Sequence, residues 1–191
     1  DSEGKAIRVQ HEAVEIPIYL ATLGPNALRF TGAAAQGWLG TSFSPDQPDA
    51  HLEYIRQGMA EADRTQGDLD LCVSVRVELG DDLVAMIERR KPAVAFNMGG
   101  MGSADTNFYN DAFKRAGYAD DALTIQQLWL AGKRDEAAKR VPDAMVTQFQ
   151  ALGDAATVTE RLTKYRDAGV TTLKLGLDSA STIGPKRYEL L

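Results

Sequence analysis

Apolar residues gather in four short runs along this chain, and each run opens into a turn rich in Gly or Ser. The runs occupy residues 16–21, 37–43, 71–79 and 171–177, and most of them are followed by a helical stretch. A repeated strand-then-helix order predicts a parallel sheet with helices packed outside it. Ligands of such sheets bind beyond the carboxyl ends of the strands, so the loops after these runs are the first candidates for chemistry.

The run at 71–79 alternates between apolar and polar residues, which predicts a strand with one face more buried than the other. Between the runs, apolar positions three or four residues apart predict helices. These helices are expected at residues 26–35, 49–63, 120–131, 134–140, 142–150 and 154–168, with a short one at 185–191. Residues 1–15 are expected to form a leader loop or a short edge segment.

The middle of the chain gives a weaker pattern. Asp81 and Asp82 suit the cap of a helix that contains Ile87, and Pro92 should kink or end that helix. Residues 93–98 form a short apolar run that fits a strand or a helix. Residues 99–103 read Gly-Gly-Met-Gly-Ser, which predicts a flexible loop.

The length of 191 residues fits one domain with a real core, although a complete eight-stranded barrel usually needs about 250 residues. Four strand–helix units are visible where a closed barrel has eight. The sheet is therefore open, or a partner chain completes it, or the chain is part of a longer protein. An α/β fold with a parallel sheet, as one domain over 1–191, is the fold class that follows.

Charge and cysteine content exclude some classes of function. The formal net charge of -6 argues against bulk attraction to nucleic acid or to anionic lipid. The single cysteine, Cys72, lies in an apolar run and is expected to be a small buried hydrophobe. One cysteine cannot form an internal disulfide, and no apolar stretch reaches the roughly 20 residues that span a bilayer, so a cytoplasmic location is expected.

Two loops after neighbouring strands could hold an anion. Thr22, Leu23 and Gly24 precede a helix, and the N–H groups of a helix start attract anions. Thr41 and Ser42 follow the next strand, where their hydroxyls could cradle a phosphate. Each loop alone is also explained as an ordinary or a capped turn, but adjacent strands would bring both loops to one ligand.

A third loop combines Gly100 and Ser103 with Asn107 further on. It lacks the Lys and Ser/Thr ending of a P-loop, which excludes a nucleoside triphosphatase. A mobile substrate lid and a packing turn with buried aromatic residues both fit it.

No catalytic acid, base or nucleophile is evident. His11 lies in a polar leader and His51 in a surface-type helix, and neither has a second ligand at metal spacing, so structural or exposed roles are expected and no metal site is predicted. The chain has no Gly-x-Ser-x-Gly elbow. Acidic pairs such as Asp120 and Asp121 suit helix caps.

Four stretches, at 16–28, 32–43, 99–103 with 107–110, and 165–173, resemble the C-terminal half of the luciferase-like monooxygenase family. The likeness covers nearly the whole chain and is greatest to members that use the deazaflavin coenzyme F420. It implies a TIM (β/α)8 barrel of which this chain supplies roughly the second half. It also implies hydride transfer between F420 and a small organic substrate; the alternative in the same family is a monooxygenase that uses FMN and oxygen.

The resemblance implies particular site residues. The turn at Thr22, Leu23 and Gly24 and the strand end at Thr41 and Ser42 would touch the phosphate-bearing tail of the cofactor. Substrate contacts are expected from the residues that match the third loop and the end of the chain, which are Gly100, Ser103, Asn107 and Arg187.

The chain also departs from the family. Ser44 stands where some relatives that act on a sugar phosphate have a lysine, which argues against glucose 6-phosphate. The family's proton-transfer residues come largely from the first half of the barrel, so the catalytic residues stay unassigned and the chain alone is expected to be nearly inert. A half barrel leaves two sheet edges open, so pairing with a second copy or with the missing half is expected. A fragment that only binds cofactor phosphate or assembles with a partner is the alternative from outside enzymology.

Overall fold

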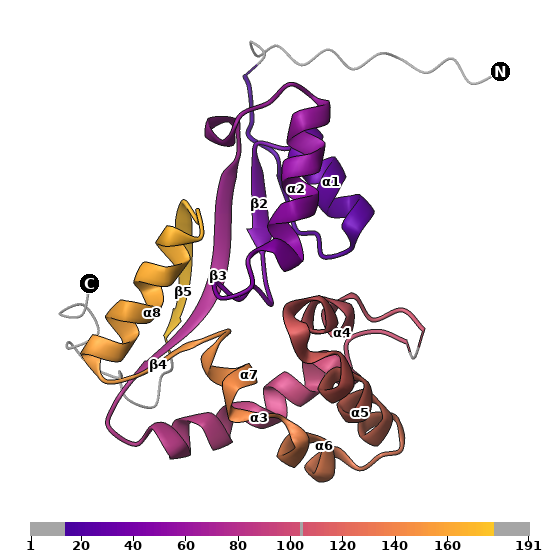
Figure 1. Cartoon of the computed structure of the whole chain (residues 1–191), viewed down its shortest axis with the longest axis vertical. Coiled ribbons are helices and arrows are strands. Elements are labelled where there is room, and N and C mark those ends of the chain that lie inside the picture. The colour runs from indigo at the N-terminus through magenta and orange to yellow at the C-terminus, as the bar shows by residue number, and fades with distance from the viewer. Residues whose placement is uncertain (1–13, 104, 178–191) are drawn as a thin grey trace, which may run out of the picture.

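The computed structural model describes residues 14–103 and 105–177, which form a parallel sheet with helices on one face and a group of helices beyond one end (Figure 1). In chain order the elements are β1 (Tyr19–Leu20), α1 (Pro25–Ala34), β2 (Gly37–Gly40), α2 (Asp49–Glu61), η1 (Gln66–Asp68), β3 (Asp70–Leu79), α3 (Leu83–Gly99), α4 (Phe108–Phe113), the π-helical η2 (Lys114–Tyr118), α5 (Ala119–Leu130), α6 (Arg134–Arg140), α7 (Asp143–Thr147), β4 (Ala151–Gly153), α8 (Ala155–Asp167) and β5 (Thr172–Leu177).

The long strand β3 is the centre of the sheet. Its first residues, 70–73, pair with β2, and residues 72–77 pair with β5, all in parallel. Val77 pairs with both Leu177 of β5 and Ala151 of β4, so β4 and β5 lie on opposite edges of β3. With β1 paired to β2, the strands β1, β2, β3 and β5 form an arc of parallel strands, which confirms the predicted α/β architecture of a partial barrel.

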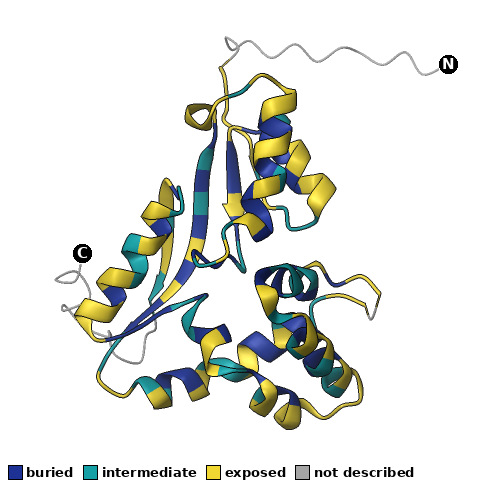
Figure 2. Cartoon of the chain, in the orientation of Figure 1, coloured by how far each residue is buried: buried dark blue, intermediate teal, exposed yellow. Residues whose placement is uncertain are grey.

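Helices α1, α2 and α8 cover one face of this arc, and their buried residues face the sheet (Figure 2). The odd-numbered residues of β3 from Leu71 to Val77 enter this core, where Trp38 and Tyr165 are the largest fully buried side chains. Ser74 and Arg76 point to the opposite, exposed face. The predicted alternation of β3 is therefore confirmed, except that Glu78 is buried.

Cys72 lies on the face of the sheet that no described helix covers, which would be the interior of a closed barrel. Its thiol lies on this face with intermediate exposure. The expectation of a buried cysteine is wrong because the run at 71–79 buries only alternate positions.

A second core lies beyond the carboxyl end of β3, where helices α3 to α7 pack together (Figure 1). Side-chain caps begin several helices: Asp82 accepts from the N–H of Ala85 at 3.0 Å, and Asp154 accepts from that of Thr157 at 2.8 Å. The predicted cap at Asp82 is thus confirmed.

Of the two alternatives predicted for Pro92, a kink or the end of the helix, the second is wrong, because α3 continues through Pro92 to Gly99. Proline removes one helix hydrogen bond and crowds the preceding turn. Burial on both sides of Pro92 opposes that cost: Ile87 before it and Met98 after it are both buried in the second core. The ambiguous run at 93–98 is helical for the same reason.

Other element boundaries also differ from the sequence-based ones. The first strand is only Tyr19–Leu20, since Pro17 has no N–H to offer and β1 is an edge strand. The second ends at Gly40, before Ser42 takes a positive φ of 51°. The predicted helix at 142–150 is the shorter α7, and the strand β4 that follows it was missed, as were α4 and η2. The predicted helix at 185–191, Arg187 and most of the leader lie outside the described residues.

Candidate functional site

The two predicted anion-binding turns lie at the same end of adjacent strands. Tyr19 pairs with Gly37 and Leu20 with Trp38, so the chain leaves β1 and β2 side by side and in the same direction. The indole N–H of Trp38 donates to the carbonyl of Thr22 at 3.0 Å, which fastens the second strand to the first turn. The sheet therefore brings residues 22–24 and 41–42 to one mouth, at the carboxyl ends of the strands.

The first turn is held firmly by its neighbours. The hydroxyl of Thr22 shares a 2.8 Å hydrogen bond with that of Thr31, so it is engaged within the fold. The guanidinium of Arg115 donates to the carbonyl of Leu23 at 2.8 Å and to that of Ala50 at 2.9 Å, which ties the turn to α2. Gly24 is the N-cap of α1 and offers no side chain to satisfy the first N–H groups of the helix.

The second turn opens into a cavity of about 580 Å³. Thr41 and Ser42 line it where β2 ends, and the open face of β3 and β5 forms one wall. Helix α3 and two phenylalanines close the other side. The remaining lining residues are Ser74, Val75, Arg76, Arg90, Ala93, Val94, Asn97, Phe113, Phe149, Gln150, Lys174, Leu175 and Gly176.

Positive charge and hydroxyl groups gather in this cavity although the chain as a whole is acidic. Arg76, Arg90 and Lys174 line it, and no Asp or Glu is among its described lining residues. Within the described residues, the side chains of Thr41 and Ser42 make no hydrogen bond to the protein. The cavity therefore has the groups that bind an oxyanion.

Glu78 lies next to the cavity but does not cancel its charge. Its carboxylate, almost fully buried, is paired with Arg89 at 2.5 Å and with Arg90 at 2.9 Å. Burial acts to raise the pKa of Glu78, but the hydrogen bonds and charges of the two arginines outweigh it and hold that pKa below its ordinary value. The carboxylate of Glu78 is thus engaged by the two arginines of α3.

His51, expected on a surface-type helix, is instead fully buried beneath the second turn. Its ring lies 5.4 Å from that of Trp38 and 5.9 Å from that of Phe43, measured between centroids. Burial, with a smaller contribution from the charge of Arg115, lowers the pKa of His51 to about 3. The imidazole is therefore neutral and is not among the residues that line the cavity, so the described lining contains no histidine or carboxylate base.

The third loop lies beside the first turn rather than in the cavity. The ring of Phe108, which begins α4, is 3.2 Å from the point where a Cβ on Gly24 would stand. Asn107 is buried: its amide donates to the carbonyl of Met98 at 2.9 Å, and its oxygen accepts from the N–H of Asn110 at 3.0 Å. A packing role thus accounts for Asn107.

The other residues expected at the substrate are placed as follows. Gly100 is the C-cap of α3, and the hydroxyl of Ser103 accepts from the N–H of Thr106 at 3.0 Å. Neither lines the cavity, so their contact with substrate stays a prediction, as it does for Arg187. Ser44 is buried and its hydroxyl accepts from the N–H of Asp46, so it offers nothing in place of the lysine of the sugar-phosphate enzymes.

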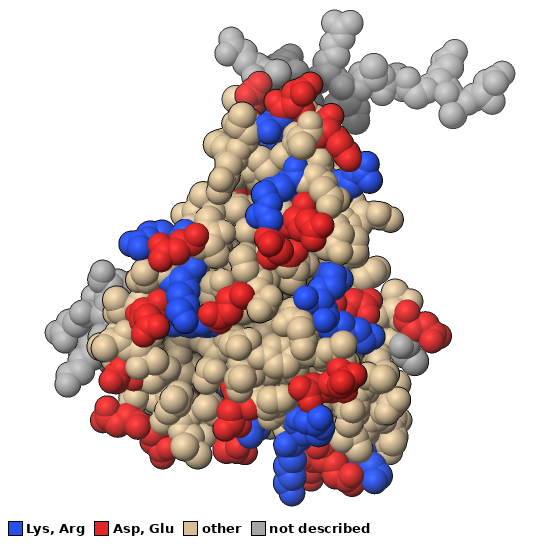
Figure 3. All heavy atoms as spheres, viewed as in Figure 1, with Lys and Arg blue, Asp and Glu red and all other residues tan. Residues whose placement is uncertain are grey.

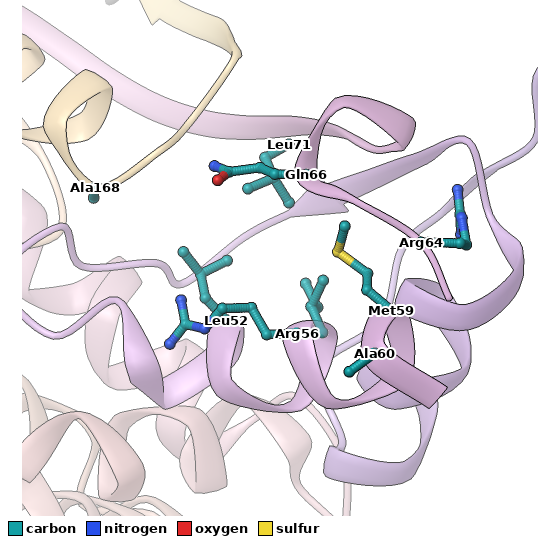
Figure 4. Close-up of a pocket in the computed structure, with 9 residues that line it drawn as sticks. Leu52, Arg56, Met59, Ala60, Arg64, Gln66, Leu71 and Ala168 are labelled. Atoms are coloured by element: carbon teal, nitrogen blue, oxygen red, sulfur yellow. The ribbon is translucent and has the colours of Figure 1, made fainter. Parts of the chain in front are cut away.

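A second cavity, of about 260 Å³, lies at the opposite end of the sheet between α2 and the end of α8 (Figure 4). Its floor is apolar, formed by residues such as Leu52, Ile55 and Leu71. Arg64 extends away from it and donates to the carbonyls of Gly32 at 2.6 Å and Ala35 at 2.5 Å. Arg56, which also lines this crevice, is paired with Asp49.

The outer surface of the molecule has no dominant charge on the face in view, where acidic and basic side chains intermingle (Figure 3). The described residues include no group of three or more His, Cys, Asp or Glu side chains placed to hold a metal ion. Among the described helices, none combines the length and apolar character that a membrane span requires.

The arc of parallel strands with polar loops at its carboxyl ends is the arrangement of part of a (β/α) barrel. The family described as luciferase-like monooxygenase matches residues 3–172, and the chain belongs to this family.

Individual relatives agree with this assignment. A Mycobacterium tuberculosis protein named as a coenzyme F420-dependent oxidoreductase is 32% identical over 184 residues, which cover 94% of this chain and 53% of that protein. The 5,10-methylenetetrahydromethanopterin reductase of Methanopyrus kandleri is 29% identical over 93% of this chain and 48% of its own length. The chain thus spans about half the length of these curated relatives.

Solved structures give the same result. The coenzyme F420-dependent tetrahydromethanopterin reductase from Methanopyrus kandleri superposes with a TM-score of 0.66 at 27% identity, over 91% of this chain and 47% of that one. An F420-dependent secondary alcohol dehydrogenase superposes with a TM-score of 0.60 at 14% identity, over 86% of this chain and 44% of that one, which supports the fold alone. Both matches fit a chain that supplies about half of the barrel.

Sequence reasoning missed the cationic side of the site. Arg76 lies in the run at 71–79 and Lys174 in the run at 171–177, and neither was predicted to bind a ligand. Their alternation with apolar neighbours places them on one face of the sheet. The local sequence pattern does not predict which loops lie next to that face. That information needed the register of β3 against β5.

Proposed function

We propose that this chain is the cofactor-tail-binding half of a coenzyme F420-dependent oxidoreductase that moves a hydride between the deazaflavin and a small organic substrate. The observation that supports it most is the meeting of the turns 22–24 and 41–42 at the carboxyl ends of two adjacent strands. The F420-dependent relatives named above supply the cofactor class.

The residues at the mouth fit a phosphate-bearing tail. Gly24 leaves the first N–H groups of α1 without a side-chain cap, and these groups can donate to an oxyanion. Thr41 and Ser42 add hydroxyl donors that make no hydrogen bond to the described protein. Arg115 keeps the Leu23 carbonyl turned toward itself, so the peptide of the turn is fixed before a ligand arrives.

When bound, the deazaflavin supplies the hydride chemistry. The described residues of this chain bind and orient: the turns hold the tail, and Phe113 and Phe149 close one side of the cavity against water. We assign the proton-transfer step to the remainder of the barrel, since the described cavity lining contains no histidine or carboxylate.

Titration of the 191-residue chain with F420, followed by calorimetry, tests the proposal. The double variant Thr41→Val with Ser42→Ala should weaken F420 binding roughly tenfold, because two hydrogen bonds to a charged group are lost. Binding of the deazaflavin nucleoside without its phosphate-bearing tail should not change. Thr159→Val, at an exposed position of α8, is the matched control.

Two results would overturn this function. The first is a chain that takes up no F420 at any concentration. The second is a double variant that binds F420 as tightly as the parent chain. A stronger and turn-dependent affinity for FMN would instead favour the FMN enzyme of the same family.

A further inference from the structure

We propose that Arg76 and Lys174, with the hydroxyl of Ser74, form a subsite for the anionic group of the substrate, a phosphate or carboxylate, separate from the turns that hold the cofactor tail. The assignment to substrate rests on the proposed function. The binding of an oxyanion to these residues does not, because it follows from their positions alone.

The sheet register brings these side chains together. Ser74 lies opposite Lys174 and Arg76 lies opposite Gly176, all on the uncovered face of the sheet. Ser74 and Lys174 are directly opposed, and Arg76 and Lys174 are diagonal neighbours within reach of long side chains, so two cations and a hydroxyl share one area of the sheet.

Gly176 determines the path of the arginine. The Cδ and Nη1 atoms of Arg76 lie 3.0 and 3.1 Å from the point where a Cβ on Gly176 would stand. A side chain at that position would displace the guanidinium. The glycine therefore lets Arg76 lie flat across β5, on the same wall of the cavity as Lys174.

Neither cation has a partner within the part of the chain that the structure describes. Arg76 and Lys174 make no ion pair or side-chain hydrogen bond there, whereas Glu78, the nearest acidic position on the strand, is already paired with Arg89 and Arg90. Two unneutralised cations beside an unbonded hydroxyl, in a cavity without a described acid, favour a ligand with an oxyanion.

The subsite and the second cofactor turn lie at a similar level of the sheet but on different strands. Thr41 follows β2, whose last residue pairs with Val73, whereas Arg76 and Lys174 lie on β3 and β5. The cavity is large enough to extend from one group to the other. A small substrate anchored at Arg76 would therefore share the cavity with a cofactor anchored at the turns.

Inorganic phosphate is the probe for the subsite, titrated calorimetrically into the full 191-residue chain. Arg76→Gln and Lys174→Gln should each weaken phosphate binding roughly tenfold, as expected for loss of one charge-assisted contact. Arg76→Lys should keep part of the affinity. Arg166→Gln removes the same charge from a side chain that is 73% exposed on α8, and should leave phosphate binding unchanged.

A second titration, in the presence of saturating F420, separates the two possible sources of the anion. Phosphate that still binds, and still depends on Arg76, supports a substrate subsite. The opposite result has three parts: F420 displaces phosphate, R76Q binds F420 more weakly, and R76Q binds the tail-free nucleoside as well as the parent chain does. This result would assign the cations to the cofactor tail and overturn the proposal.

The remaining outcomes are also decisive. Phosphate binding that is absent, or equal in the parent chain, R76Q and K174Q, would overturn the subsite while leaving the cofactor turns untouched. If phosphate binds in an Arg76-dependent way but F420 does not bind at all, the proposed function is overturned. The oxyanion site would remain, but it could no longer be assigned to a substrate of hydride transfer. Circular dichroism of each variant shows that the fold is retained.

Discussion

The imidazole of His51 is enclosed by Trp38 and Phe43, and neither of its ring nitrogens has a hydrogen-bond partner in the described structure. A buried polar group without partners destabilises the fold, and protonation would add a buried charge beside Arg115. The ring therefore stays neutral and serves as a wall beneath the turn at 41–42. The burial of His51 by its neighbours is therefore the reason why this histidine cannot act as a general base.

The stability of the chain should consequently depend on pH through His51. Its pKa is about 3 in the folded chain and 6.5 as an ordinary value, so only the unfolded chain gains a proton between these limits. The free energy of unfolding is therefore independent of His51 titration above pH 6.5. It decreases as the pH falls from 6.5 toward 3, by at most about 1.4 kcal/mol per pH unit. His51→Phe should flatten this fall.

Urea unfolding at about pH 7.5 and about pH 5.5 measures the effect. His11→Phe is the control, because His11 is the other histidine of the chain. A pH dependence that is unchanged in H51F but abolished in H11F would refute the role of His51.

Among the elements, the pair α1 and α2 sets the geometry of the mouth. The two helices cross at reciprocal glycines: a Cβ on Gly58 would collide with the carbonyl oxygen of Arg29, and one on Gly32 with that of Ile55. Because α1 begins at the first turn and α2 follows the second, this close crossing fixes the distance between the two turns. The packing of two helices thus positions a site that neither helix forms alone.

Gly58→Ala tests this crossing. Alanine inside a helix is normally more stable than glycine by up to about 1 kcal/mol. Here the backbone contact should reverse the sign and cost roughly 1–3 kcal/mol of unfolding free energy. Urea unfolding of G58A measures it, with Gly67→Ala as the control, since the nearest atom to a Cβ on Gly67 is 4.0 Å away. A stabilised G58A would show that the helices can separate without cost.

At the scale of the whole molecule, an unfinished sheet is the dominant feature. One face of the sheet is uncovered by helices within the described residues, and Tyr19 and Leu39 are exposed there by 39% and 42%. Apolar surface and open strand edges favour association with more chain. This fits a chain that spans about half the length of its relatives.

The isolated 191-residue chain should therefore associate and show almost no deazaflavin turnover. Sedimentation velocity should detect species larger than a monomer, and Leu39→Lys, which places a charge on the open face, should shift them toward monomer. A spectrophotometric assay with reduced and oxidised F420 measures turnover. A well-folded monomer with full activity would contradict both expectations.

The sequence by itself determined four of the strands, most of the longer helices, the alternation of β3 and the cap at Asp82, because these depend on residues close together in the chain. It also indicated both turns at the mouth, since the parallel order of β1 and β2 brings their ends together. Tertiary structure alone decided that α3 passes through Pro92, that His51 is buried, and that Arg76 and Lys174 share a cavity with Thr41 and Ser42. These features depend on contacts between distant segments. The local sequence pattern does not show how far burial will offset the free-energy cost of a proline in a helix or of a polar group in the core.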